Sequence, residues 1–299
     1  MSRPRSLSGT CSIRSSTGAS ATVNGDFAAL ARLLDVLRPW RKNLVVIGGW
    51  AHWLYRLHDK SNRPSYQTLQ TKDVDLAFSL TSPPDGDIGA ALKRADFHER
   101  LSGDHVPPVT RYQLGDGDLG FYAEFLVPLS GSATKRDGTP DATVAEAGVT
   151  AQKLRHLEIL LQSPWTVIVD AKAGLPVRAP LHLQIANPVT FIAQKLLIHG
   201  ERDSRKQAHD VLYIHDTLDL VAGQLGELSA MWQKHIRPTL SPKTAKLVER
   251  FWVEQFSGVT DVIRSAARIP QDRALSPENL QKACAYGLGE IFGSAGDRS

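Results

Sequence analysis

Two aspartates, Asp73 and Asp75, stand one residue apart in a run whose other positions, including Val74, Leu76 and Phe78, are mostly apolar. This alternation is typical of a half-buried β-strand, on which residues i and i+2 point to the same face. Two carboxylates that converge on one point repel each other unless a cation neutralises them. The pattern therefore predicts a strand that presents both aspartates to one metal ion, and Mg²⁺ or Mn²⁺ suits ligands that are all oxygen.

A glycine pair precedes this strand. The short β-branched run 44–47 ends at Gly48 and Gly49, and a helical pattern resumes at Trp50. Glycine has no Cβ, so its backbone can approach a phosphate closely, and N–H groups at the start of a helix can donate to triphosphate oxygens. A lone glycine pair is more often an ordinary turn. The order of glycine turn, helix and paired aspartates favours nucleotide binding by Gly48 and Gly49.

A third acidic residue, Glu124, lies in the predicted strand 120–127, which is otherwise mainly apolar. An unpaired carboxylate buried there would cost several kcal/mol, and a metal ion would remove that cost. We therefore predict Glu124 as the third metal ligand. The alternative is that Glu124 pairs with an arginine in the core or faces solvent. If it lay on the opposite face of the sheet, Glu99, Asp116 or Asp118 would be the replacements.

Lys195, Lys206 and Asp210 lie on two predicted helices further along the chain. Lys206 and Asp210 are four residues apart and so share a helix face, where the aspartate can orient the ammonium group toward a triphosphate. The alternative is a solvated salt bridge that contributes about 0.3–0.5 kcal/mol. Gly200 is expected to end the helix that carries Lys195.

The chain is predicted to have a mixed α/β part followed by a helical part. Apolar residues at helical spacing begin after Asp26, and a predicted helix 88–100 and several strands follow. After Asn187 and Pro188 the pattern is helical almost to the end. We therefore predict a disordered tail over residues 1–25, an α/β domain over 26–186 and a helical domain over 187–299. The serine-rich start of the chain leaves a transit peptide open as the alternative to a tail.

Composition limits the partners and the compartment. The net charge of +4 is a modest basic excess, which favours polyanions such as RNA or triphosphates. Cys11 and Cys284 lie far apart and match neither a zinc site nor a disulfide framework, so a reducing, cytoplasmic compartment fits best. No stretch approaches the roughly 18–20 apolar residues of a transmembrane helix, and we predict no membrane partner.

These motifs, in this order, resemble the nucleotidyltransferase superfamily, whose pattern is a glycine pair, a helix, Asp-x-Asp and a later strand acid. The downstream segments 188–197 and 205–211 resemble the AbiEii and MenT group of bacterial toxin-type nucleotidyltransferases and their relatives. The resemblance covers residues 44–216. It implies a nucleotidyltransferase-type mixed sheet with flanking helices as the catalytic domain, followed by a mostly helical C-terminal domain.

The resemblance also implies an activity: metal-dependent transfer of a nucleotide from a nucleoside triphosphate to an acceptor. It gives Lys195, Lys206 and Asp210 the places of the lysine, the basic residue and the aspartate found on the two helices of that group. A tRNA or another RNA is the leading acceptor, and an antitoxin protein is an expected partner. Mg²⁺, or Mn²⁺, is the expected cofactor.

The chain departs from the family in two respects. Residues 50–72 separate Gly49 from Asp73, a longer interval than the family usually has. The excess is a polar segment around Pro64, predicted to be a surface insertion beside the site that helps choose the acceptor. In addition, Gly49 stands where many members have serine, so a side-chain hydroxyl contact to phosphate is missing there.

Two other functions stay open at this point. The dipeptides His209-Asp210 and His215-Asp216 are similar to the metal-binding pairs of some phosphohydrolases, although further ligands at suitable spacing are lacking. A nucleotidyltransferase fold without catalytic activity could instead bind RNA or a protein partner. Retention of three carboxylates argues against this second function, because an inactive fold does not need to keep like charges together.

Overall fold

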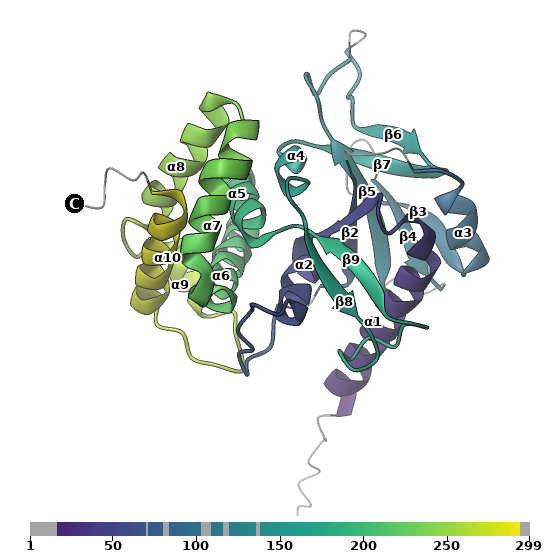
Figure 1. Cartoon of the computed structure of the whole chain (residues 1–299), viewed down its shortest axis with the longest axis horizontal. Helices are drawn as coiled ribbons and strands as arrows, with labels where there is room; N and C mark the ends of the chain where they lie inside the picture. The colour runs from purple at the N-terminus through teal and green to yellow at the C-terminus, as the bar shows by residue number, and fades with distance from the viewer. Residues whose placement is uncertain are drawn as a thin grey trace, which may run out of the picture.

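The computed structural model describes residues 17–69, 71–79, 84–102, 109–115, 120–135 and 138–293. Figure 1 shows two parts next to each other. One is a mixed sheet with its flanking helices, and the other is a bundle formed by the helices α5 to α10. One continuous cluster of buried apolar side chains runs from the sheet into the bundle. The predicted fold class, a mixed α/β domain followed by a helical region, is confirmed.

Within the described residues the sheet has nine strands: seven follow the order β3-β4-β5-β2-β1-β9-β8, and β7 pairs with β5 and with β6. β1 is antiparallel to β2 and parallel to β9, while β2 is parallel to β5. The strands are β1 (Leu44–Ile47), β2 (Asp73–Phe78), β3 (Phe97–Ser102), β4 (Val109–Leu114), β5 (Tyr122–Pro128), β6 (Thr143–Glu146), β7 (Val149–Leu154), β8 (Trp165–Val169) and β9 (Leu181–Ile185).

The helices of the sheet region are short apart from the first. They are α1 (Thr17–Val36), α2 (Gly48–Leu54), α3 (Ile88–Arg94) and α4 (Leu157–Leu160), with 3₁₀ turns η1 (Arg38–Trp40) and η2 (Tyr55–Leu57). The helical region consists of α5 (Pro188–Ile198), α6 (Ser204–Leu220), α7 (Leu225–Met231), α8 (Pro242–Phe256), α9 (Asp261–Ala267) and α10 (Pro277–Phe292), with the short turns η3 (His199–Glu201), η4 (Ala222–Gln224), η5 (Trp232–Ile236) and η6 (Arg237–Thr239).

Side-chain caps fix where the two functional helices begin. Asn187 accepts a hydrogen bond from the N–H of Thr190, and Pro188 occupies the first turn of α5. Asp203 caps α6 in the same way by accepting from the N–H of Lys206. Each cap satisfies an N–H group that the helix itself leaves free. Since β9 ends at Ile185, the chain passes directly from the sheet to α5.

The predicted helix 88–100 is too long. α3 ends at Arg94, because Asp96 takes a left-handed φ of 65° and the buried Phe97 then begins β3. Glu99 therefore lies on an edge strand of the sheet, paired with Tyr112 of β4. Asp116 and Asp118 lie outside the described residues.

The first helix begins earlier than predicted. α1 starts at Thr17, whereas the apolar periodicity used for the prediction starts only at Phe27. Residues 1–16, most of the predicted tail, lie outside the described residues, and so does Cys11. Within the described part of the chain, none of the helices has the length and apolar character that crossing a bilayer requires.

Candidate active site

Asp73 and Asp75 lie at the start of β2, and both are partly buried. In the pairing of β1 with β2, Asp75 stands opposite Ile47, directly before the glycine turn. Gly48 has a φ of 64°, in the left-handed region, and a Cβ built on it would overlap Asp75 Oδ2. Position 48 therefore requires glycine for two reasons: it adopts this φ without strain, and it leaves room for the carboxylate.

Negative charge is concentrated around Asp75. Burial raises the pKa of Asp75 well above its usual range, and the carboxylates of Asp73 and Glu124 raise it further. Lys195 and Arg202 lower this pKa without cancelling the rise. A divalent cation would lower the pKa of Asp75, because it favours the ionised form of every carboxylate near it.

Glu124 lies beside Asp75, because the parallel register of β2 and β5 pairs these two residues. It is also held by an arginine: Arg111 Nε donates to Glu124 Oε1 over 2.8 Å. The Arg111 guanidinium in turn lies 4.5 Å from the ring centroid of Tyr122. The structure thus brings Glu124 to the site and also forms the arginine pair that the sequence left open.

The carboxylates of Asp73, Asp75 and Glu124 fit Mg²⁺ or Mn²⁺ in part. Asp73 and Asp75 offer carboxylate oxygens from one rigid strand, which suits a hard cation that keeps several water ligands. Among the described residues, however, no group of three or more acidic, histidine or cysteine side chains is positioned to hold one ion. Asp73 and Asp75 stay the candidate ligands for the predicted ion, and the third predicted ligand, Glu124, is engaged by Arg111.

Lys195 projects from α5 toward the site and is almost completely buried. Its Nζ lies 2.6 Å from Asp210 Oδ1 and 4.6 Å from the ring centroid of Tyr213. Burial lowers the pKa of Lys195, and the ion pair with Asp210 raises it. The ammonium group is held in one place by these contacts, which is what a group that positions phosphates requires.

The predicted pairing of Lys206 with Asp210 is wrong. Asp210 is buried on the face of α6 that meets α5, where it pairs with Lys195 and, over 3.3 Å, with Arg202 Nε. Lys206 lies in the first turn of α6 with 61% of its side chain exposed, 3.6 Å from the capping Asp203. The physical reason is burial: Asp210 needs a partner inside the protein, and Lys206 points to solvent.

Arg202 and Tyr213 are site residues that the sequence did not indicate. The Arg202 side chain is 36% exposed, and its charge acts on Asp75. A Cβ built on Gly49 would lie 2.8 Å from Tyr213 Oη and 2.5 Å from Thr71 Cγ2. The tyrosine hydroxyl thus lies in the space that a side chain at position 49 would enter.

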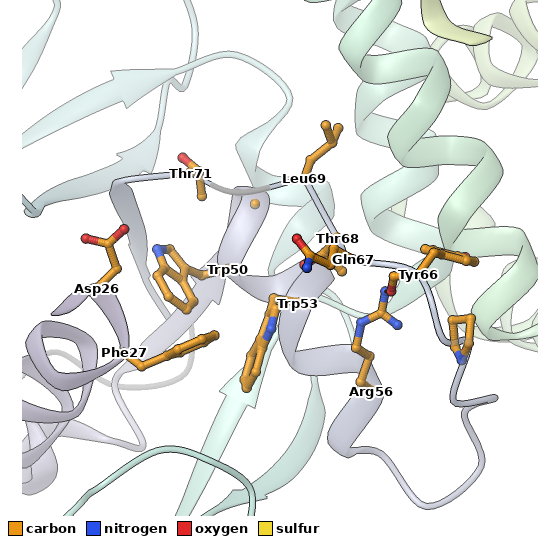
Figure 2. Close-up of a pocket in the computed structure, with 12 residues that line it drawn as sticks. Asp26, Phe27, Trp50, Trp53, Arg56, Tyr66, Gln67, Thr68, Leu69 and Thr71 are labelled. Carbon is orange, nitrogen blue, oxygen red and sulfur yellow. The ribbon is translucent and has the colours of Figure 1, made fainter. Parts of the chain in front are cut away.

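A cavity of about 320 Å³ opens beside the glycine turn (Figure 2). Four aromatic rings contribute to its wall, which also includes Gly49 of the glycine turn and Thr71, two residues before Asp73 in the sequence. The complete lining is Asp26, Phe27, Gly49, Trp50, Trp53, Arg56, Pro64, Tyr66, Gln67, Thr68, Leu69 and Thr71.

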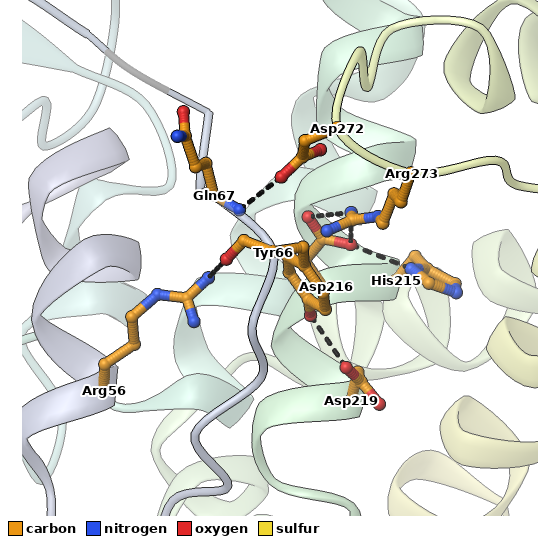
Figure 3. Close-up of polar contacts among 8 residues, drawn as sticks. All are labelled: Arg56, Tyr66, Gln67, His215, Asp216, Asp219, Asp272 and Arg273. Carbon is orange, nitrogen blue, oxygen red and sulfur yellow. Dashed lines mark hydrogen bonds and ion pairs between the residues drawn. The ribbon is translucent and has the colours of Figure 1, made fainter. Parts of the chain in front are cut away.

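The segment between η2 and β2, predicted to be a surface insertion, is attached to the helical region. Tyr66 Oη donates to Asp219 Oδ2 over 2.8 Å, and the N–H of Gln67 donates to Asp272 (Figure 3). The guanidinium of Arg273 lies 3.4 Å from the ring centroid of Tyr66. The segment therefore forms one wall of the cavity and is fixed in place by α6 and by the loop before α10.

Asp216 belongs to the same network and has a structural role. Arg273 Nη2 donates to both of its carboxylate oxygens, and His215 Nδ1 lies 2.9 Å from Oδ1 (Figure 3). These partners lower the pKa of Asp216 although burial acts to raise it. The carboxylate is already neutralised, which leaves the phosphohydrolase alternative without an available metal ligand at this dipeptide.

A family model described as nucleotidyltransferase matches residues 26–237. Among solved structures, the nucleotidyltransferase toxin MenT4 from Mycobacterium tuberculosis H37Rv is similar, with 16% sequence identity, a TM-score of 0.34, and coverage of 93% of this chain and 85% of that one. No curated protein sequence matches. The family match includes both glycines, the three carboxylates, Lys195 and Arg202. It confirms the resemblance to the superfamily.

Proposed function

The chain belongs to the nucleotidyltransferase family, and on that premise we propose that it transfers a nucleotidyl group from a nucleoside triphosphate to an acceptor hydroxyl with the help of Mg²⁺ or Mn²⁺. The observation that carries the proposal is the packing of Asp75 against the glycine turn. Gly48 has the backbone conformation and the missing side chain that let the Asp75 carboxylate lie against the turn, at the N-terminal end of β2 where Asp73 also lies. A strand that served only to stabilise the fold would have no need of two neighbouring carboxylates.

Asp73 and Asp75 would hold the cation. When bound, the cation supplies positive charge to the triphosphate and to the pyrophosphate that leaves. Lys195, Arg202 and the hydroxyl of Tyr213 face the same region, and we assign to them the orientation of the phosphates. The N–H groups of the glycine turn are expected to contribute in the same way.

The chemical step is a substitution at the α-phosphorus. The acceptor oxygen forms a bond to that phosphorus, the bond to the bridging β-phosphate oxygen breaks, and pyrophosphate leaves with the electron pair. The hydroxyl proton passes to water or to Glu124, which lies beside Asp75. The Arg111 partner keeps the Glu124 carboxylate oriented, and a nearby cation makes it a weaker base.

For the acceptor we propose RNA, with a tRNA end as the first candidate. The net charge of +4 and the resemblance of the helical segments to the toxin-type group support this choice. An antitoxin protein is the corresponding proposal for a partner, and the cytoplasm is the proposed compartment. Charge complementarity alone would make binding to RNA dependent on salt concentration.

The test uses purified protein, each α-labelled nucleoside triphosphate in turn, Mg²⁺, and total cellular RNA or protein as acceptor. We expect label to enter RNA with the wild-type chain and to disappear with chelator or with Asp75→Asn. The melting temperature of this variant should hold or rise, because one of two repelling carboxylates is removed. Asp59→Asn is the control, since that side chain is 87% exposed and pairs with His58 rather than with a residue of the site. Equal labelling by Asp75→Asn and wild type would contradict the proposal.

A further inference from the structure

The cavity beside the glycine turn has the composition of a site for a flat aromatic ligand. The ring centroids of Phe27 and Trp53 are 4.9 Å apart, those of Phe27 and Trp50 are 5.7 Å apart, and those of Trp50 and Trp53 are 6.1 Å apart. Phe27, Trp53 and Tyr66 are only partly buried, so ring surface remains open to the cavity (Figure 2). Aromatic faces of this kind stack on nucleobases whatever the base sequence.

Two hydrogen-bond donors at the cavity lack partners. Trp50 is 5% exposed, and its indole Nε1 has no acceptor among the described residues. Arg56 Nη2 donates to the carbonyl oxygen of Tyr66 over 3.1 Å, but the neighbouring Nη1 has no acceptor in the described part of the chain. Buried donors are nearly always satisfied in native proteins, so each such exception needs an explanation. A ligand acceptor atom would satisfy the Trp50 donor, whereas Arg56 lies at the other end of the cavity, beyond Trp53 (Figure 2).

The cavity is connected to the catalytic carboxylates. Gly49 and Thr71 line it, and Thr71 stands two residues before Asp73 on the same segment. The space into which a Cβ on Gly49 would point is bounded by Thr71 and by Tyr213 Oη, and Tyr213 belongs to the phosphate region described above. A ligand with its flat part in the cavity and its charged part at Asp73 would therefore pass across the glycine turn.

We propose that this cavity binds the nucleobase of the donor nucleoside triphosphate, stacked against Trp53 and hydrogen-bonded to the indole of Trp50. The inference rests on the proposed function, because it uses the phosphate site at the glycine turn to orient the nucleotide. A nucleobase of an RNA acceptor could make the same stacking and hydrogen-bond contacts. The donor is favoured because one molecule then joins the aromatic wall to the triphosphate contacts.

The test compares a nucleoside triphosphate with inorganic tripolyphosphate, both in the presence of Mg²⁺, by isothermal titration calorimetry on the full chain. Trp53→Ala should weaken nucleoside triphosphate binding by about 5- to 150-fold, the range for loss of one stacking ring. Trp50→Phe keeps an aromatic ring but removes the donor, and should weaken it by about 2- to 10-fold. Binding of tripolyphosphate should not change in either variant.

Trp165→Ala is the matched control, because this partly buried tryptophan stacks on His58 and does not line the cavity. Trp53→Phe should restore most of the affinity lost in Trp53→Ala if stacking is the cause, and the melting temperature of each variant shows that it is folded. Nucleoside triphosphate binding that is unchanged in both cavity variants, while tripolyphosphate still binds, overturns the proposal and leaves the proposed function standing.

Two further outcomes are informative. If the variants lose affinity only for an RNA oligonucleotide, the cavity holds the acceptor base and the assignment to the donor is wrong. If neither tripolyphosphate nor any nucleoside triphosphate binds to the wild-type chain with Mg²⁺, the proposed function itself fails and this inference fails with it.

Discussion

Replacing Gly48 by alanine should both strain the backbone and displace a carboxylate of the site. The φ of 64° at this position costs an L-residue about 1–2 kcal/mol of folding free energy. The new methyl group would also overlap Asp75 Oδ2, so the carboxylate must move. A displacement of about 1 Å at a catalytic group typically costs on the order of 10²-fold in rate. We therefore expect Gly48→Ala to lose about 1–2 kcal/mol of stability and on the order of 10²-fold in kcat.

Gly174→Ala provides the comparison that this experiment needs. Gly174 has a φ of 83°, also left-handed, and a Cβ built on it would meet nothing within 4 Å. This variant should lose a similar amount of stability in urea denaturation and keep the wild-type kcat in the labelling assay. If Gly48→Ala also keeps the wild-type kcat at equal folded fraction, Asp75 does not need its position against the turn, and its assignment as a metal ligand is wrong.

Two other predictions follow from the site and the core. Arg202→Ala should lower the rate of labelling on the order of 10²-fold, as loss of one charge-stabilising donor commonly does. Lys206→Ala should leave the kinetics unchanged. Equal effects of the two changes would contradict the assignment of Arg202, rather than Lys206, to the phosphate site. His52 is fully buried, and desolvation lowers its pKa from 6.5 to about 3, so the unfolded chain binds the proton first as the pH falls. Its neutral form stabilises the fold fully above pH 6.5, and about 2 kcal/mol should be lost at pH 5. Urea titrations at pH 8 and pH 5 should show this loss in the wild type and a smaller one in His52→Leu.

The sequence predicts the paired aspartates on β2 and the glycine turn that follows β1. Alternation places Asp73 and Asp75 on one face, and the required glycine at position 48 marks the turn before α2. Glu124 is predicted for a related reason, because an acid inside an apolar strand needs a partner. These inferences use spacing over a few residues, where the geometry of a strand leaves little freedom.

The residues that the sequence misses reach the site through tertiary contacts. Arg111 meets Glu124 only because β4 pairs with β5. Tyr213 reaches Gly49 from the middle of α6, and Arg202 precedes that helix in a turn. Helical spacing allows Lys206 to pair with Asp203 before it or with Asp210 after it. The spacing alone does not show that Asp210 is the buried one. Only the packing of α6 against α5 selects Lys195 as the partner of Asp210.

The long interval between the glycine turn and β2 gains a physical role from these contacts. Tyr66, in the middle of that interval, lies with its ring 5.2 Å from the Arg56 guanidinium and 3.4 Å from that of Arg273. Arg273 is in turn fixed by the buried Asp216 of α6. The cavity wall is therefore held by the helical region as well as by the sheet. On the proposed assignment, this segment builds a pocket next to the phosphate site, so its length would influence which nucleotide is used before it influences which acceptor is chosen.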